Sequence, residues 1–305
     1  MKKIFVSVMI ALTAAAAFAV DFSPNLLAED AQWVMHANFD KGRSTEFGQF
    51  VMSEMKKGKC KAKLEESKAL LNMDPSTDIA SITAYGWDML KEEGALLIDG
   101  RIDRTAMVDF LSQVDGFQTR TLDGYQVMSW NSMKCGDGTK ETCATFTAQG
   151  MMVVSDSLEG VAKAADVLAG RSGAIGTASP LNLANQGQSA FMAAAVNVDQ
   201  AENIPAKAAL IKQSKSMVFS LSESAGNIVM TVKLNAADAE TAMNVDSIAR
   251  GMLAMMYMQS QENPQLAEIA KGVSIVNNGT EVVVSMRIPV ASVIDMYYEK
   301  KINAI

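Results

Sequence analysis

The chain has 305 residues, 49% of them apolar, and its 27 basic against 34 acidic side chains give a net charge of −7. An acidic chain lacks the positive field that drives nucleic-acid binding through counterion release, so we expect no nucleic-acid partner. The length suffices for two domains of roughly 100 to 200 residues, each with a substantial core.

The first nineteen residues have the three parts of a bacterial secretory signal peptide. Lys2 and Lys3 supply the positive region, residues 4–16 the apolar region and Ala17-Phe18-Ala19 the cleavage site. This leader (1–19) predicts export to the periplasm or the cell exterior, with a mature chain that begins at Val20. Removing the two lysines from the 27 basic residues leaves 25 against 34, a charge of −9. No later segment reaches the ~18 consecutive apolar residues of a membrane-spanning helix, so none is expected.

Residues 20–170 alternate between short strands and helices. The first strand, residues 32–39, places Trp33 and Met35 opposite His36, the period of two of a half-buried strand. His36 is the only histidine, and we expect it to be a surface or hydrogen-bonded strand residue. Further strands are predicted at 79–87, 95–102, 117–122, 125–130, 144–148 and 151–155, and helices from Ser44 or Thr45 and at 60–72, 105–114 and 158–169.

Two local signals in this half are specific. Asp123-Gly124 between two strand-like segments predicts a two-residue hairpin turn, because both turn residues must tolerate positive φ. Ser157 is placed to cap the start of the helix at 158–169, and Gly170 to end it.

The three cysteines allow one disulfide in an oxidising compartment. Cys135 and Cys143 bracket the turn-rich segment 136–142, which predicts a bridge across the neck of a hairpin. Cys60 is then the unpaired cysteine. A buried thiol, a redox-sensitive thiol and an intermolecular link are the alternatives for it.

A run of lysines surrounds Cys60. Such a cluster suits contact with anionic headgroups or an acidic partner, and the alternative is a solvated, lysine-rich helix turn. Its members are Lys56, Lys57, Lys59, Lys61 and Lys63.

Residues 171–188 are rich in Gly, Ser, Ala and Asn and contain Pro180, which predicts a linker. After it the same order of elements recurs, so residues 20–170 and 189–305 are expected to be two copies of one β-α-β-β-α-β-β unit. The second copy has predicted strands at 189–198, 216–222, 227–234, 273–277 and 280–288, and helices at 201–212, 236–261 and 290–301.

The expected fold class is therefore α+β. It comprises two related lobes, each a mainly antiparallel sheet with helices on one face, because hairpins joined by returning helices favour that layered arrangement.

Residues 27–40 (LAEDAQWVMHANFD), followed by Phe47-Gly48, resemble the start of a broad group of uncharacterised exported bacterial proteins. Residues 155–161 are similar to the passage from strand to helix in the same group. The resemblance implies export and an internal repeat. The group has no agreed activity, so it implies no site residue.

Motifs of enzyme chemistry are sparse. Ser53-Glu54-Met55-Lys56 matches S-x-x-K, but the accompanying S-D-N and K-T-G motifs are missing, and residues 136–140 lack the spacing of a phosphate loop. One histidine cannot build a multi-histidine metal site. We expect no catalytic, cofactor-binding or metal-binding residue, and a non-enzymatic protein.

Methionine is unusually frequent, with 22 residues against 11 Phe. Residues 251–258 are apolar nearly all round a predicted helix, so this segment is expected to be fully buried or to contact something else. Flexible thioethers suit adaptable surfaces. The candidate hydrophobic binding or interface residues are Met252, Met255, Met256 and Tyr257.

These patterns predict an exported binding or envelope-associated protein whose partner is an envelope protein. One alternative is a carrier of a small hydrophobic ligand with the methionine-rich helix as a pocket wall. Another is a hydrolase whose serine and carboxylate residues converge only in the folded chain.

Overall fold

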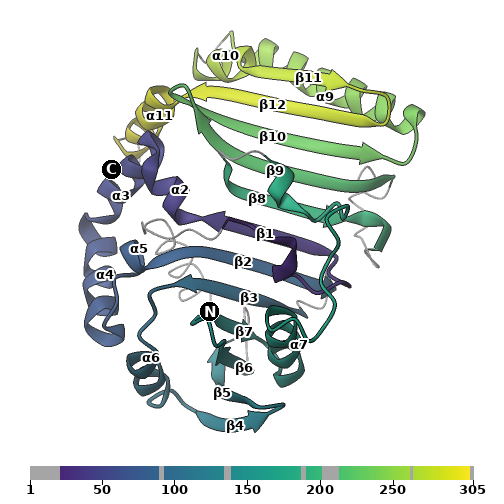
Figure 1. Cartoon of the computed structure of the whole chain (residues 1–305). Helices are drawn as coiled ribbons and strands as arrows, with labels where there is room; N and C mark the ends of the chain where they lie inside the picture. The colour runs from purple at the N-terminus through teal and green to yellow at the C-terminus, as the bar shows by residue number, and fades with distance from the viewer. Residues whose placement is uncertain are drawn as a thin grey trace.

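Figure 1 shows the computed structural model, which describes residues 21–88, 93–133, 139–186, 190–200, 213–261 and 264–302. The strands of the first half are β1 (Trp33–Asn38), β2 (Ile79–Asp88), β3 (Glu93–Gly100), β4 (Gln118–Leu122), β5 (Tyr125–Met133), β6 (Thr139–Phe146) and β7 (Met152–Ser155). Those of the second half are β8 (Ala190–Asn197), β9 (Ser214–Ser224), β10 (Asn227–Ala236), β11 (Val273–Asn277) and β12 (Glu281–Pro289).

The helices lie mainly at the ends and edges of these strands. In the first half they are η1 (Pro24–Leu26), α2 (Phe39–Ser44), α3 (Glu46–Met55), α4 (Gly58–Leu71), α5 (Pro75–Asp78), α6 (Arg104–Leu111) and α7 (Leu158–Leu168). The remainder are η2 (Leu183–Gln186), η3 (Val198–Gln200), α9 (Ala239–Gln259), α10 (Pro264–Lys271) and α11 (Val290–Ile302). The predicted leader and the predicted helix at 201–212 lie outside the described residues.

All the strands belong to one antiparallel sheet that runs through both halves of the chain (Figure 1). Its order is β11-β12-β10-β9-β8-β1-β2-β3-β7-β6-β5-β4. The predicted α+β class with antiparallel sheets is confirmed. The two halves meet where β1 pairs with β8, so they share a sheet as well as a chain.

The two halves share part of their strand order, and their duplication stays a prediction. In each half three strands form a meander outward from the seam, β1-β2-β3 and β8-β9-β10. A helix then leads to strands that return, and the last of these, β7 or β12, pairs with the third strand of the meander. The first half contains an additional pair of strands in its returning segment, which the predicted unit did not include.

The segment predicted as a linker is instead part of the main core. Ile175, Leu181 and Leu183 are buried with strand residues from both halves, and Ala174 forms a bridge with Ala28. The composition of 171–188 pointed to a linker because small and polar residues outnumber these few apolar ones. Burial depends on where the apolar residues lie, so the prediction was wrong.

The main core lies on one side of the sheet, called here the Tyr85 face. Val34, Tyr85 and Leu97 point into it from β1, β2 and β3, and each is almost fully buried. They are covered by the segment from Phe22 to Ala31, by α7 and by the segment that contains Ile175.

The buried side of β1 is opposite to the side that its apolar pattern favours. Val34, His36 and Asn38 are buried on the Tyr85 face, whereas Met35 on the other side is 43% exposed. The alternation itself was correct. An antiparallel sheet can leave either face open to solvent, so alternation alone does not tell which face other elements cover.

The predicted caps and turns are confirmed at several places. Thr45 accepts a hydrogen bond from Gly48 N at the start of α3, and Ser157 accepts one from Gly160 N at the start of α7. Asp123 and Gly124 have φ values of 51° and 83°, as the two-residue hairpin requires.

Candidate functional site

Helix α9 lies along the edge of the sheet beside β11 and β12 (Figure 1). Its first turn is fixed by Asp238, whose side chain accepts a hydrogen bond from Thr241 N at 2.7 Å. Ala242 is fully buried there, and Val245 packs with Ile275 and Val284. The helix is therefore anchored mainly through its N-terminal half.

The opposite side of α9 carries a stripe of large apolar side chains that face solvent. They lie four, three and three residues apart, which places them along one side of a helix. Ile248, Met252, Met255 and Met258 are 46%, 59%, 57% and 73% exposed. These four residues are called the methionine face below.

The structure separates the four residues singled out from the sequence. Met252 and Met255 lie on the methionine face, whereas Met256 is half-buried on the side turned toward the sheet. The Tyr257 hydroxyl donates to the Ala270 carbonyl at 3.1 Å and so ties α9 to α10. Ile248 and Met252 do not continue the core side of the helix begun by Val245, because these two side chains turn to solvent.

The charged groups of α9 end at Arg250, near the middle of the helix. Glu240 is exposed, and Asp246 forms two hydrogen bonds with Arg250, at 2.8 and 2.9 Å. Arg250 also donates to the carbonyl of Ile275 at 3.3 Å. From Gly251 to Gln259 the helix carries no charged residue.

A second apolar surface, which the sequence analysis missed, is the side of the sheet opposite the Tyr85 face. It is called the Met35 face, and one row of residues paired across its strands is apolar from β11 to β5, beyond which Met128 pairs with Thr119 of β4. The row reads Ile275, Val284, Val232, Phe219, Ala194, Met35, Ala84, Leu96, Val154, Ala144 and Met128.

Helices cover this face at its two ends. Met128 and Ala144 pack with residues of α6, and Ile275 and Val284 pack with α9. Between these ends Met35 is exposed and Phe219 is half-buried. Each strand contributes one apolar residue to this row, and only the strand register brings these residues together.

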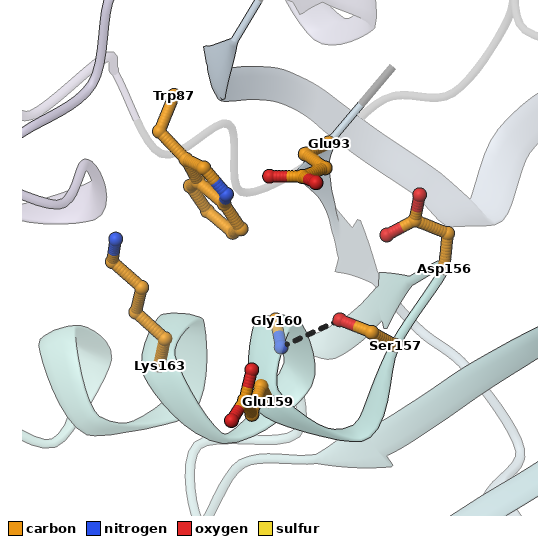
Figure 2. Close-up of a pocket in the computed structure, with 7 residues that line it drawn as sticks. All are labelled: Trp87, Glu93, Asp156, Ser157, Glu159, Gly160 and Lys163. Atoms are coloured by element: carbon orange, nitrogen blue, oxygen red, sulfur yellow. Dashed lines mark hydrogen bonds between the residues drawn. The ribbon is translucent and has the colours of Figure 1, made fainter. Parts of the chain in front are cut away.

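A polar pocket of about 340 Å³ opens at the start of α7 (Figure 2). It is lined by Trp87, Glu93, Asp156, Ser157, Glu159, Gly160 and Lys163. The Lys163 ammonium lies 4.3 Å from the centre of the Trp87 ring and 2.5 Å from an oxygen of Asp30. Its charge is therefore already paired with a carboxylate and an aromatic ring.

The pocket offers little for catalysis. The Ser157 hydroxyl accepts the hydrogen bond from Gly160 N at 3.0 Å, and Asp156 forms an ion pair with Lys140. No histidine lines the pocket. Within the described ranges, no cluster of His, Cys, Asp and Glu side chains is arranged to hold a metal ion.

His36 lies away from these surfaces, on the Tyr85 face. Its Nδ1 and the Thr83 hydroxyl are 2.9 Å apart, and the Phe22 ring packs edge-on at 5.6 Å, so the hydrogen-bonded alternative predicted for it is confirmed. Burial lowers the pKa of His36 to about 4; the Lys41 ammonium adds to this shift and Asp21 opposes it. His36 is therefore neutral at physiological pH, and its ring packs and hydrogen-bonds within the core as a structural side chain.

The lysine cluster lies where α3 passes into α4. Lys56, Lys57, Lys61 and Lys63 are exposed, and Lys57 forms an ion pair with Glu54 at 2.5 Å. The side chain of Lys59 lies outside the described residues. Contact with an anionic surface stays a prediction for this cluster.

The cysteines differ from the prediction. Cys143 is a free, fully buried thiol in the middle of β6, opposite Ser129 on β5, and not at the hairpin neck, where Met133 faces Thr139. Four residues of strand, about 13 Å, separate Cys143 from that neck, whereas a disulfide needs Cα atoms within about 7 Å. Cys135 lies outside the described residues. Cys60 is a free, half-buried thiol.

No family model matches the chain, and no curated protein matches it either. Among solved structures the fold is similar to that of TP0453. Crystal form III has a TM-score of 0.50 at 10% identity, covering 90% of this chain and 96% of that chain. Crystal form I has a TM-score of 0.47 at 11% identity. The likeness shows that the arrangement of the sheet and helices recurs in a solved protein. Within the described residues, no helix has an apolar stretch long enough to cross a membrane.

Proposed function

We propose that this chain is an exported, non-enzymatic protein of the bacterial envelope that binds another envelope protein through the methionine face of α9. The observation that carries the proposal is the exposure of Ile248, Met252, Met255 and Met258 along one side of a helix whose other side is anchored to the sheet. Clustered apolar side chains of this kind mark interaction surfaces in soluble proteins.

The energetics favour a partner. Burying one large apolar side chain completely contributes roughly 1.5 to 3 kcal/mol, so four that are about half exposed leave several kcal/mol for an interface. Methionine side chains also adjust their shape to the surface that covers them. The methionine face therefore provides both free energy and adaptability.

The alternatives receive less support from the geometry. A carrier with the methionine-rich helix as a pocket wall needs Met252, Met255 or Met256 around an enclosed space, but the first two face solvent. The pocket in Figure 2 is lined mainly by polar and charged groups, with Ser157 engaged as a helix cap. These features suit neither a hydrophobic ligand nor a serine nucleophile.

Site-directed photo-crosslinking in cells tests the proposal. A benzophenone amino acid replaces Met255 in the full chain, and the matched control carries it at the exposed Asp109 of α6. We expect a discrete crosslinked protein from position 255 only, together with a processed N-terminus at Val20 by mass spectrometry. A processed chain with no crosslink at position 255, or with equal crosslinks at both positions, contradicts the proposal.

A further inference from the structure

We infer that the segment docking on the methionine face is an apolar α-helix of the partner protein whose flanks carry Lys or Arg. This inference rests on the proposed function and names the chemistry of the partner. It follows from the shape of the face and from the charges of α9. The same charges disfavour the two other kinds of occupant, a lipid surface and a second copy of this chain.

The shape of the face matches a helix. Ile248 to Met258 span about 15 Å along α9 at 1.5 Å per residue, about three turns. Gly251 and Ala254 lie between the large side chains, and a Cβ at Gly251 would meet nothing within 4 Å, so another helix has open access to the backbone there. A partner helix with apolar residues at i, i+3 or i+4, and i+7 covers the same length.

The exposed acidic charges of α9 lie at its start. Asp238 and Glu240 are exposed there, about 12 to 15 Å before Ile248 at 1.5 Å per residue, and the only basic residue of the helix, Arg250, is already held by Asp246. The whole chain carries a charge of −7, so the long-range field also attracts a basic partner. An apolar helix with basic residues beyond its apolar segment satisfies both the neutral stripe and the acidic start of α9.

The same charges disfavour a lipid surface and a second copy. Helices that lie on anionic membranes carry Lys and Arg along the polar side, whereas α9 has a single, paired arginine. A second copy would bring its own Asp238 and Glu240 and the same net negative charge. Two helices in contact over about 15 Å bury less than a standard interface of ~1,600 Å², so the expected complex is transient, with a Kd in roughly the micromolar range.

The test uses the full mature chain and two synthetic helical peptides with the same leucine face. One peptide has lysine flanks and the other glutamate flanks, and binding is followed by fluorescence anisotropy. We expect the lysine peptide to bind at least about tenfold more tightly, with an affinity that falls as salt is added. Glu240→Gln should reduce the preference for the lysine peptide.

Variants of the face provide the matched controls. The double change Met252→Gln with Met255→Gln should lower affinity for the lysine peptide about tenfold or more, and Met252→Leu with Met255→Leu should keep it. These side chains are exposed, so all variants should keep the thermal unfolding midpoint of the parent chain. If the glutamine pair unfolds at a lower temperature, Met258→Gln replaces it.

Several outcomes overturn the inference. Equal binding of the two peptides would contradict the basic flanks of the partner helix. A dimer seen by sedimentation and abolished by Met252→Gln would assign the face to a second copy of this chain. Binding to phosphatidylglycerol vesicles that depends on the same methionines assigns it to lipid. If neither peptide binds while the crosslink at position 255 persists, the inference fails and the proposed function stands.

Discussion

Met35 lies directly opposite Ala194 where the two halves of the sheet meet. Each of these residues is three positions before an asparagine that begins a matching tripeptide, Asn38-Phe39-Asp40 in one half and Asn197-Val198-Asp199 in the other. Under the predicted duplication, Met35 and Ala194 are equivalent positions of the two units, paired with each other. An antiparallel pair centred on equivalent residues has a local two-fold axis, like the interface of a symmetric dimer.

Gly86 makes room for Trp33 across the β1–β2 pair. A Cβ at Gly86 would lie 2.4 Å from the Glu93 carbonyl oxygen and 2.7 Å from Trp33 Nε1, so Gly86→Ala should lower the free energy of unfolding by about 1 to 3 kcal/mol through overpacking. Urea denaturation measures the change. The control is Gly251→Ala in α9, where the new methyl group meets open space and should raise stability by up to about 1 kcal/mol. Equal effects of the two changes would contradict this account.

Glu223 of β9 links the second half of the chain to helix α3 of the first. Its carboxylate accepts hydrogen bonds from Glu46 N at 3.0 Å and from Phe47 N at 2.8 Å, at the positive end of that helix. Glu223→Gln removes the charge, and we expect a loss of about 1 kcal/mol in urea denaturation. Glu66→Gln on the exposed side of α4 is the matched control, with little expected change. A loss of the same size in the control would mean that the effect is one of net charge.

His36 should make stability depend on pH in the acidic range. Its pKa is about 4 in the folded chain and 6.5 when unperturbed, so between these values the unfolded state binds more protons. The contribution is fully present above about pH 6.5 and is lost as the pH falls to 4, a decrease of roughly 3 kcal/mol. Unfolding free energies of the parent and of His36→Gln, measured from pH 7 to pH 4, should converge by about that amount. Parallel curves would contradict the shift.

Arg250 protects an exposed sheet edge. Gly272 O accepts from Arg287 N of β12, so Val273, Ile275 and Asn277 direct their backbone groups away from β12. Arg250 occupies the central one of these carbonyls, Ile275 O, beside a strand that contains no charged residue. Arg250→Ala should therefore increase association through β11. Light scattering at rising protein concentration measures it, with Lys271→Ala as the control of equal charge; aggregation by both variants alike would point to net charge.

The Cys143 thiol should be inert in the folded protein. Burial raises its pKa to about 11, so thiolate is scarce at neutral pH, and the side chain is enclosed by Val127 and Val161. Iodoacetamide at pH 8 should leave it unmodified until denaturant is added. Mass spectrometry of the unreduced protein checks the bridge that the sequence predicted. A linked Cys135–Cys143 peptide would show that the bridge forms after all.

Local signals predicted much of this fold. Thr45 and Ser157 cap the helices that they were expected to begin, and the Asp123-Gly124 turn has the backbone angles that its sequence requires. Each of these features depends on residues within a few positions of one another. Such information is contained in a short stretch of sequence.

The seam and the Met35 face could not be predicted in the same way. The pairing of β1 with β8 joins residues that are far apart in the chain, and the row through Met35 and Phe219 exists only once every strand is in register. The apolar residues 251–258 left open whether this segment is buried or contacts something else, and in the folded chain Met252, Met255 and Met258 are exposed. Their position on an outer helix became visible only in the folded chain.

The position of β1 between β2 and β8 constrains the order in which the chain can mature. A chain exported behind an N-terminal signal peptide is delivered N-terminal half first, and β8 follows β1 by roughly 150 residues. Until it arrives, the first half presents an unpaired strand bearing Trp33 and Met35. The C-terminal half must therefore be present before the outer edge of β1 is paired. A truncated chain that ends before residue 190 would keep β1 as an unpaired edge strand able to pair with another chain.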